Sequence, residues 1–596
     1  MKVDKLTLNH IFDRTERLEA PIFQRPYVWK QEENWEPLWE SIKNICDRRF
    51  ENKQTRPHFF GTIVLDQVGT PTGKLPARQI IDGQQRLTTF QLFLAAVRDL
   101  CKERSETKYA ETFEKLTIND FPLKESDDED FKVWPTNSDQ NIFRRIMKAG
   151  SPIAVRKISD EDEFLIAQAY LYFSDEIGQW LGASGTEEFK TKLGIIYQIV
   201  RTDLLIVVID LEEGDDAQEI FETLNALGTP LLPADLVKNY LFHLAEFKKL
   251  NTEELYKKYW SVFDQETKYW RHEIRQGRLK KPVLDHFLNH YLTLMLADEV
   301  PSTQLFTNYK RYVQESNMDV SVQMAQFLDY AMVYKSFDEF SEESREELFF
   351  YRLDQLDTTT VYPLLLELVK IYYGKENKKT LVDILLDIES FLVRRLICEL
   401  TPKNFNKLFI GLVKELKNTN DFSHSKIRNH LLSQTSDISR WPNDEELYKS
   451  WMNNEFYRRQ KRSRASMILK ALNSALHTGK TELLKLDDKL TIEHLLPQDW
   501  GKYWPLDTKE GGAGYKEKAE IRNSVLHKIG NLTLLTKELN PSVSNGPWDK
   551  KRKEILKHSA LNLNRSLPDK WNERAIEDRG KELFKTVVKI WPYPTK

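Results

Sequence analysis

Residues 490–551 contain three short segments that organise the C-terminal part of the chain: LTIEHLLPQDW at 490–500, LHKIGNLTLLTKELN at 526–540 and GPWDKK at 546–551. The first is an extended stretch that ends near Pro497, and the second has a Gly-Asn turn before an apolar run at 532–535 that is typical of a strand. Successive side chains of a strand point to opposite faces, so Glu493 and His494 are expected to diverge from one extended segment.

The polar residues of this region are the types that a one-metal phosphodiesterase site requires. His494 is suited to the role of general base because imidazole titrates near neutral pH. The carbonyl of Asn540 is a hard oxygen ligand of the kind that Mg²⁺ accepts, and Glu493 supplies a carboxylate. The amide of Asn531 is expected to hold the His494 ring. A lone histidine in a turn is usually structural, but four such residues in this order favour a nuclease.

The same residues resemble the HNH, or His-Me finger, endonuclease domain, through E-H-x-x-P at 493–497 and G-N-L-T-L-L-T at 530–536. The resemblance implies a ββα-metal fold in which His494 is the general base, Glu493 and Asn540 bind the metal, and Asn531 positions the base. It also implies that Lys550 contacts phosphate. Glutamate replaces the aspartate of many members, the last ligand is asparagine instead of histidine, and no zinc-binding cysteine pairs flank the site.

Composition narrows the class of protein. The chain has 596 residues, enough for two or three domains, and a net charge of −3, so any basic surface for a nucleic acid must be local. The three cysteines, Cys46, Cys101 and Cys398, lie far apart, which argues against a disulfide framework and fits the cytoplasm. The first residues lack the apolar core of a signal peptide, and we expect no membrane span.

The N-terminal region, 1–210, is predicted to be α/β. Strands are expected at 59–67 and 78–81, followed by the turn DGQQR at 82–86 and by a helix. Leu87, Phe90, Phe93, Leu94, Val97 and Leu100 are expected on one face of that helix. A glycine turn before a helix, with an arginine in the first helical turn, suits a phosphate. The alternative is a purely structural glycine turn with an arginine on the surface.

IIDGQQRLTTFQLF at 80–93, with FQRPYVW at 23–29 and HFFGTIVL at 58–65, resembles the ParB/sulfiredoxin-like domain of GmrSD-type modification-dependent restriction enzymes. The resemblance implies a nucleoside-triphosphate site, with Mg²⁺, that controls cleavage. The residues that it assigns to nucleotide binding are Gln24, Arg25, Asp82, Gly83, Gln84, Gln85 and Arg86. Trp29 and Trp35 are expected in the core rather than as base-stacking platforms.

The middle region, 211–440, is predicted to be mainly helical. Helices are expected at 216–226, at 236–244 and at 381–392, the last ended by Arg394 and Arg395, whose charges suit a helix C-terminus. Lys238 and Asn239 are interpreted as a solvated helix face, with phosphate contact as the alternative. The fold class is therefore α+β multidomain, with a helical domain between an α/β domain and a nuclease domain at 441–596.

A basic cluster at 456–470 is expected to form one helix that leads into the nuclease domain. Its candidate DNA contacts are Arg458, Arg459, Lys461, Arg462 and Arg464. A solvated charged helix face is an equally good interpretation.

The sequence predicts a Mg²⁺-dependent endonuclease, regulated by a nucleoside triphosphate, that cuts modified phage DNA such as DNA with glucosylated hydroxymethylcytosine. A homodimer is expected because a double-strand cut requires two nuclease sites. Three alternatives stay open: a phosphorothioate-sensing nickase, an RNA-cleaving toxin, and a non-catalytic nucleotide or DNA sensor.

Overall fold

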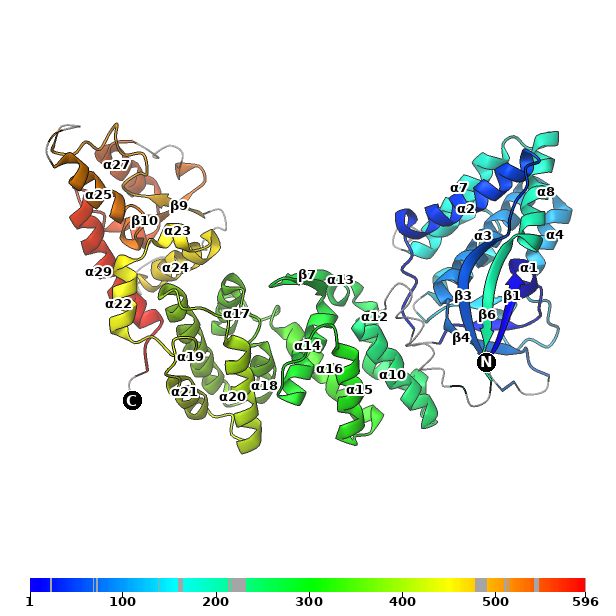
Figure 1. Ribbon diagram of the computed structural model, residues 1–596, viewed down its shortest axis with the longest axis horizontal. Helices are drawn as coiled ribbons and strands as arrows, with labels where there is room; N and C mark the ends of the chain where they lie inside the picture. The colour runs from blue at the N-terminus through cyan, green and yellow to red at the C-terminus, as the bar shows by residue number, and fades with distance from the viewer. Residues whose placement is uncertain are drawn as a thin grey trace. The chain divides into compact units, whose positions relative to one another are not determined.

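The computed structural model describes residues 1–21, 24–67, 69–70, 73–137, 139–158, 164–212, 215, 232–477, 490–508, 512, 514–540 and 546–594. The chain divides into two compact units. The first comprises Met1–His272, Val283–Asp285 and Phe306–Gln326, and the second comprises Glu273–Pro282, His286–Leu305 and Phe327–Lys596. Figure 1 shows the elements of both units and labels many of them.

The first unit contains a six-stranded mixed sheet with the strand order β1-β6-β3-β4-β2-β5. The β1/β6 and β3/β4 pairs are antiparallel, and the β6/β3, β4/β2 and β2/β5 pairs are parallel. Both predicted strands are present, each one residue longer at its start or at both ends. The strands are β1 (Lys2–Thr7), β2 (Arg17–Glu19), β3 (His58–Gln67), β4 (Ala77–Asp82), β5 (Val133–Trp134) and β6 (Leu204–Asp210).

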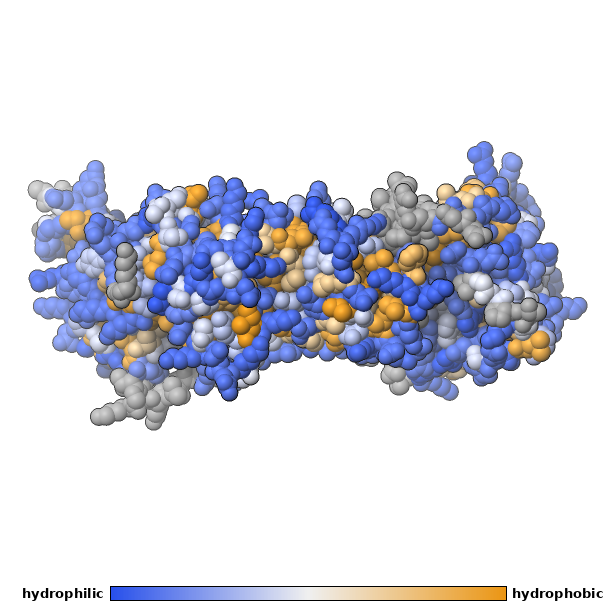
Figure 2. Space-filling view, turned by 90° about the horizontal axis from the view of Figure 1, so that it is seen from below, coloured by the Kyte–Doolittle hydropathy of each residue, from blue (hydrophilic) through white to orange (hydrophobic). Residues whose placement is uncertain are grey.

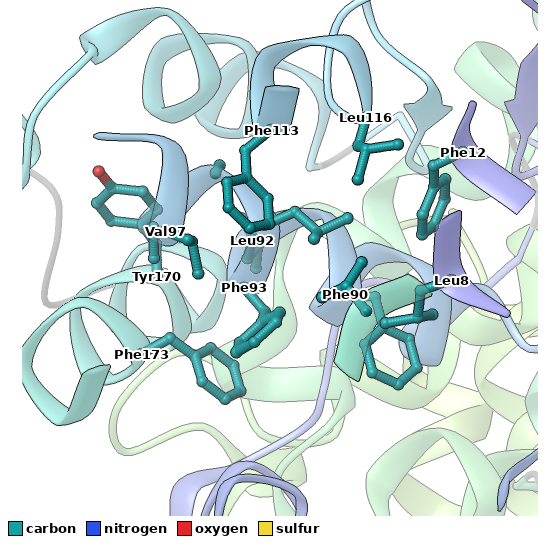
Figure 3. Close-up of a cluster of buried hydrophobic side chains, with 14 of the residues drawn as sticks. Leu8, Phe12, Phe90, Leu92, Phe93, Val97, Phe113, Leu116, Tyr170 and Phe173 are labelled. Carbon is teal, nitrogen blue, oxygen red and sulfur yellow. The ribbon is translucent and has the colours of Figure 1, made fainter. Parts of the chain in front are cut away.

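Helix α3 (Gln84–Glu103) is the centre of the core of this unit (Figure 3). Phe90, Leu92 and Phe93 of α3 lie among side chains of α1, α4 and α7, such as Phe12, Phe113 and Phe173. The predicted helix is confirmed, but it is buried nearly all round instead of on one face, because other helices cover its second side. The other helices here are α1 (Leu8–Phe12), α2 (Glu36–Phe50), α4 (Thr107–Lys115), α5 (Gln140–Ala149), α6 (Pro152–Arg156), α7 (Leu165–Leu181) and α8 (Glu187–Thr202).

The predicted helix at 236–244 is α10 (Pro233–Phe247), whereas the one predicted at 216–226 lies outside the described residues. Both interpretations of Lys238 are wrong, because this side chain is completely buried and pairs with Asp264 at 2.5 Å. Its Nζ also donates to the Gln24 carbonyl at 3.3 Å. Arg271 pairs with Asp264 at 3.3 Å and with Asp235 at 2.7 Å, so that two cations face two carboxylates. Asn239 is buried as well. Short helices α11 (Thr252–Leu255), α12 (Ser261–Gln265) and α13 (Thr267–Trp270) follow.

Helices predominate in the rest of the middle region, as predicted, with one hairpin of β7 (Glu273–Gln276) and β8 (Leu279–Pro282). Arg394 and Arg395 do lie in the last turn of α19, but they are buried and donate to the carbonyls of Trp591 and Thr401, respectively. Their main role is therefore to join segments of the chain. The helices are α14 (Val283–Leu296), α15 (Leu305–Ser316), α16 (Val320–Ser336), α17 (Arg345–Leu356), α18 (Tyr362–Tyr372), α19 (Lys378–Ile397), α20 (Phe405–Thr419) and α21 (His424–Leu432).

The C-terminal region of the second unit is built around a small antiparallel ladder of β9 (Leu490–His494) and β10 (Leu532–Thr536). A core of Leu495, Leu496, Val525, Ile555 and other apolar residues packs near the ladder. The helices are α22 (Asp444–Asn453), α23 (Phe456–Arg459), α24 (Arg462–Ala475), α25 (Tyr515–Val525), α27 (Trp548–His558), α28 (Asn562–Arg565) and α29 (Glu573–Ile590).

On the face shown in Figure 2, hydrophobic residues form small groups among hydrophilic ones, as is usual for globular proteins. Within the described ranges, no helix is long and apolar enough to span a membrane. All three cysteines are free thiols, in agreement with the argument from their spacing against a disulfide framework.

Candidate active site

The β9/β10 ladder determines which way Glu493 and His494 point. Glu493 pairs with Thr533 and His494 pairs with Leu532, at the end of the ladder next to the Gly530–Asn531 turn. Thr491 and Glu493 are two residues apart on one strand, so they share a face, and His494 lies on the other. The predicted divergence of the two side chains is therefore a direct result of the strand.

His494 is buried beside a second histidine. Its Nε2 lies 3.2 Å from Nδ1 of His527, and its Nδ1 lies 3.5 Å from Nε2 of Gln498. The Tyr457 ring meets the His494 ring edge-on, with centroids 4.2 Å apart. Burial lowers the pKa of His494 to about 3, and the neighbouring His527 and Lys551 act in the same direction, so the ring is neutral at physiological pH.

Asn531 is completely buried and holds backbone instead of the His494 ring. Its Oδ1 accepts hydrogen bonds from the Leu496 N–H at 2.7 Å and from Trp571 Nε1 at 3.1 Å. Its Nδ2 donates to the carbonyls of Leu496 at 2.8 Å and Leu526 at 2.9 Å. The prediction that the amide holds the ring is wrong. The amide instead ties the segment after His494 to the segment before His527, because both segments have unpaired backbone groups there.

Gly530, which precedes Asn531, allows helix α29 to pack directly on the turn. A Cβ atom at this position would collide with the backbone carbonyl oxygen of Ile576 in α29. Arg579 of the same helix donates to the carbonyls of Gly530 and Leu532, each at 2.7 Å. Glycine is thus required at position 530 because the backbone of α29 packs closely on it, and asparagine is required at position 531 because its buried amide bonds to the backbone.

Asn540 approaches the same face of β9 as Glu493. Its Nδ2 donates to Thr491 Oγ1 at 2.8 Å, which leaves the carbonyl oxygen as the remaining polar atom of the amide. In the described part of the chain, no three His, Cys, Asp or Glu side chains gather in a group that could hold a metal ion. One carboxylate and one amide oxygen still fit Mg²⁺, which usually keeps several water ligands and takes one or two carboxylates from the protein.

Lys551 belongs to the site, and the phosphate contact that was expected of Lys550 stays a prediction. The Lys551 Nζ pairs with Glu493 Oε1 at 2.5 Å and donates to the His494 carbonyl at 2.6 Å, and the side chain is buried. Lys550, the preceding residue of α27, is exposed, because its side chain points about 100° away around the helix. Burial raises the pKa of Glu493 and lowers that of Lys551, and the attraction between the two opposes both shifts.

The basic segment 456–470 is not one helix, because Gln460 is extended (φ −100°, ψ 147°) and separates α23 from α24. Three of its predicted DNA contacts have partners in α17 and α19 or in the turns that follow them. Arg459 pairs with Glu399 at 2.7 Å and Lys461 with Asp357 at 3.3 Å, and Arg464 donates to the Leu356 carbonyl at 2.7 Å. These contacts favour a structural role for the three residues.

Arg458 and Arg462 are the members of the cluster that face the two histidines. Arg462 stacks on Tyr457, with its guanidinium carbon 3.4 Å from the ring centroid, and it is exposed. Both arginines lower the pKa of His527, after burial, which is the largest cause. A positive, exposed rim therefore lies next to His494 and His527.

In the first unit, the three glutamines assigned to nucleotide binding hold the 24–28 loop against the DGQQR turn. Gln24 Nε2 donates to the carbonyl of Ile80 at 2.6 Å, and Gln84 Nε2 donates to that of Arg25 at 2.7 Å. Gln85 accepts from the Val28 N–H at 2.8 Å and donates to the Pro26 carbonyl at 3.1 Å. These side chains shape the loop, and the nucleotide contact that was predicted for them stays a prediction. Trp35 is buried and Trp29 packs against the core, as expected.

Arg25, Asp82 and Arg86 form a group of half-buried charges at this turn. Burial raises the pKa of Asp82, opposed by Arg86 and Arg25. Arg86 donates to the Thr62 carbonyl, so its guanidinium is not a free surface fork. Gly83 precedes α3 with a φ of 95°, and a Cβ atom there would lie 2.5 Å from Ile63 Cγ2, so the turn requires glycine.

Two residues of the C-terminal site escaped the sequence analysis. His527 lies four residues before Asn531 in LHKIGN, and Lys551 follows Lys550 in DKK. A histidine that close to a site asparagine is a usable signal, but nothing in the sequence distinguishes the buried lysine from its exposed neighbour.

Two models of one known family match the N-terminal and C-terminal parts of the chain. A model described as the GmrSD restriction endonuclease N-terminal domain matches residues 8–242, and a model of the GmrSD restriction endonuclease C-terminal domain matches residues 441–586. No individually curated protein matches the chain. The N-terminal match covers strands β2 to β6 and the DGQQR turn, and the C-terminal match covers the β9/β10 ladder with Glu493, His494 and Asn531. The chain belongs to the GmrSD family of restriction endonucleases, which are nucleases that act on DNA.

Proposed function

We propose that the C-terminal site hydrolyses DNA phosphodiester bonds with a divalent cation, in a ββα-metal arrangement of β9, β10 and α27. One observation carries the proposal: Glu493, His494 and Asn540 meet at one short ladder, which Asn531 and Lys551 hold in place. A decayed nuclease domain would be expected to have lost at least one of the residue types of this set.

The residues divide the chemistry as follows. Glu493 and Asn540 would hold Mg²⁺, which stabilises the negative charge that develops on the phosphate and on the leaving oxygen. His494 takes a proton from the attacking water. Lys551 keeps the Glu493 carboxylate and the His494 backbone in place through its two hydrogen bonds. Arg458 and Arg462 supply charge for the DNA backbone on the exposed rim.

The rim can be tested by salt titration of DNA binding. Each lost phosphate contact reduces the slope of log K against log salt by about 0.9 for duplex DNA. We expect Arg462→Ala to lower the slope by about 1. Arg459→Ala is the matched control, because its guanidinium already pairs with Glu399, and it should leave the slope nearly unchanged.

We further propose that the first unit binds a nucleoside triphosphate, with Mg²⁺, and thereby controls cleavage. The supporting observation is the group of Arg25, Asp82 and Arg86 beside a positive-φ glycine at the start of α3, where backbone N–H groups and arginines suit phosphate. Arg25→Ala should abolish nucleotide hydrolysis while the purified chain stays folded. Normal hydrolysis by this variant would place the nucleotide elsewhere.

The target is proposed to be modified phage DNA, and matched substrates test this directly. Unmodified, glucosylated-hydroxymethylcytosine and phosphorothioate DNAs would be incubated with the protein and Mg²⁺, with and without a nucleoside triphosphate. We expect cutting of one modified DNA only. Equal cutting of all three would retain the nuclease and remove the modification requirement, whereas no cutting would favour an RNA substrate or a sensor.

The assignment of the site is tested on the substrate that is cut. His494→Ala and Asn540→Ala should each abolish cleavage and retain the circular dichroism spectrum of the wild type. His558→Ala, which removes an exposed histidine of α27, is the matched control and should cut normally. Near wild-type cutting by His494→Ala would refute the assignment of the base.

A further inference from the structure

His494 and His527 lie side by side, and one ring nitrogen of each histidine faces a ring nitrogen of the other. The His494 Nε2 to His527 Nδ1 distance of 3.2 Å is that of a hydrogen bond, and both rings are buried, with 4% and 2% of their surface exposed. One of the two nitrogens must carry the shared proton and the other must accept it.

Two neighbouring residues, Tyr457 and Asn531, hold His527 in place through three contacts. Tyr457 stacks on its ring, with an angle of 8° between the planes and 5.8 Å between the centroids. The Tyr457 N–H also donates to the His527 carbonyl at 3.1 Å. The residue before His527 accepts a hydrogen bond from the buried Asn531 amide. His527 is therefore clamped through both its ring and its backbone.

The charges near His527 favour its neutral form. Arg458 and Arg462 are the positive groups that act on the ring, and Glu455 is the opposing negative group. When the His527 ring is neutral and carries its proton on Nε2, its Nδ1, which faces Nε2 of His494, can accept a hydrogen bond.

We propose that His527 is a positioning residue, which accepts a hydrogen bond from Nε2–H of His494 and thereby makes Nδ1 of His494 the atom that takes the proton from water. This inference rests on the proposed function of His494 as the general base. It also assigns the tautomer, because a proton held on Nε2 leaves the Nδ1 lone pair as the acceptor, on the side where the Gln498 amide nitrogen lies 3.5 Å away.

The hydrolysis step then balances in protons and bonds. The water oxygen bonds to phosphorus, its proton passes to Nδ1 of His494, and the bond between phosphorus and the 3′ oxygen breaks. The 3′ oxygen takes a proton from solvent, so the products are a 5′-phosphate and a 3′-hydroxyl. His494 is now a cation, and its Nε2–H bond to His527 becomes charge-assisted and stronger.

Asparagine and glutamine at position 527 separate this role from a structural one. The Oδ1 of asparagine is two bonds from Cβ, as Nδ1 of histidine is, so His527→Asn keeps an acceptor at the required place. The terminal atoms of glutamine are one bond further out, near the position of Nε2, so His527→Gln keeps an amide but moves it. The pair is matched in polarity and differs in where the acceptor lies.

The experiment measures single-turnover cleavage by the full-length protein, with Mg²⁺ and the DNA that the wild type cuts. We expect His527→Ala and His527→Gln to lower the rate constant about 10- to 100-fold, the range that loss of a residue orienting a site histidine costs, with DNA affinity unchanged. His527→Asn should cut within about fivefold of the wild type. His558→Asn and His558→Gln, on the exposed surface of α27, are matched controls and should cut normally.

Equal rates for His527→Asn and His527→Gln would overturn the proposal, whether both are fast or both slow, because the acceptor position would not matter. His494→Ala in the same assay separates the two failures. If this variant cuts, the proposed function itself is wrong. If it is inactive while the two position-527 amides behave alike, only the role of His527 is wrong.

Discussion

Replacing Asn531 by alanine tests whether one buried amide holds the two halves of the nuclease site together. The side chain makes four hydrogen bonds, to Leu496 N–H, Leu496 C=O, Leu526 C=O and Trp571 Nε1, and it is completely buried. At about 1 kcal/mol net for each bond, and allowing for water in the new space, the local structure should lose about 3 to 4 kcal/mol. This corresponds to about 100- to 1000-fold in an opening equilibrium.

Hydrogen exchange read by mass spectrometry measures that opening peptide by peptide. In Asn531→Ala, exchange should accelerate by this factor in peptides covering 490–500 and 522–532, and it should be unchanged in α19 of the helical region. Asn540→Ala is the matched control, since within the described residues the side chain of that asparagine makes one hydrogen bond, to Thr491. Its loss of about 1 kcal/mol corresponds to about fivefold. Acceleration of less than about threefold in Asn531→Ala would refute the reasoning.

Three further predictions concern other parts of the chain. Gly530→Ala should unfold the β9/β10 region, because the added Cβ meets the Ile576 carbonyl, and this unfolding should be measured as a loss of protection from hydrogen exchange. Gly411→Ala is the control: its Cβ points into open space on α20, and the substitution should slow hydrogen exchange of that helix about fivefold. Gln85→Leu leaves the Val28 N–H unpaired, so exchange in the 24–30 loop should rise roughly 30-fold for a loss of about 2 kcal/mol, and unchanged exchange would contradict the clamp. Burial lowers the pKa of His290 to about 3 from 6.5, so the folded state binds fewer protons than the unfolded chain below pH 6.5 and stability falls as the pH drops. Urea unfolding of the second unit should lose about 2 kcal/mol from this group between pH 7 and pH 5, and His290→Gln should remove that part of the pH dependence.

Local patterns in the sequence were sufficient for several of the elements. The β-rich run at 59–67 and the helical periodicity after Arg86 correspond to β3 and α3. Patterns of this kind act within one segment, since a strand or helix forms from neighbouring residues. They failed where a distant segment intervened, as at Gln460, whose side chain donates to the Leu396 carbonyl while its backbone breaks the predicted helix.

The DGQQR turn illustrates a different limit. The sequence places Gln24, Gln84 and Gln85 in one motif, which suggests a common ligand, whereas the structure gives each of them a carbonyl partner within the protein. The buried backbone of the 24–28 loop needs these partners, because an unpaired buried carbonyl or N–H is costly. The charged members, Arg25, Asp82 and Arg86, are the residues on which the proposed nucleotide site depends.

By itself, the sequence determined the family, the chemical types at the nuclease site and the strand that separates Glu493 from His494. Residue type and the alternation of successive side chains along a strand are local properties, which do not depend on distant segments of the chain. Only the tertiary structure decided that Lys551 rather than Lys550 meets Glu493, that Asn531 binds backbone, and that His527 faces His494. These contacts join residues 33 to 58 positions apart, and they depend on how the helices bury their apolar faces around the ladder.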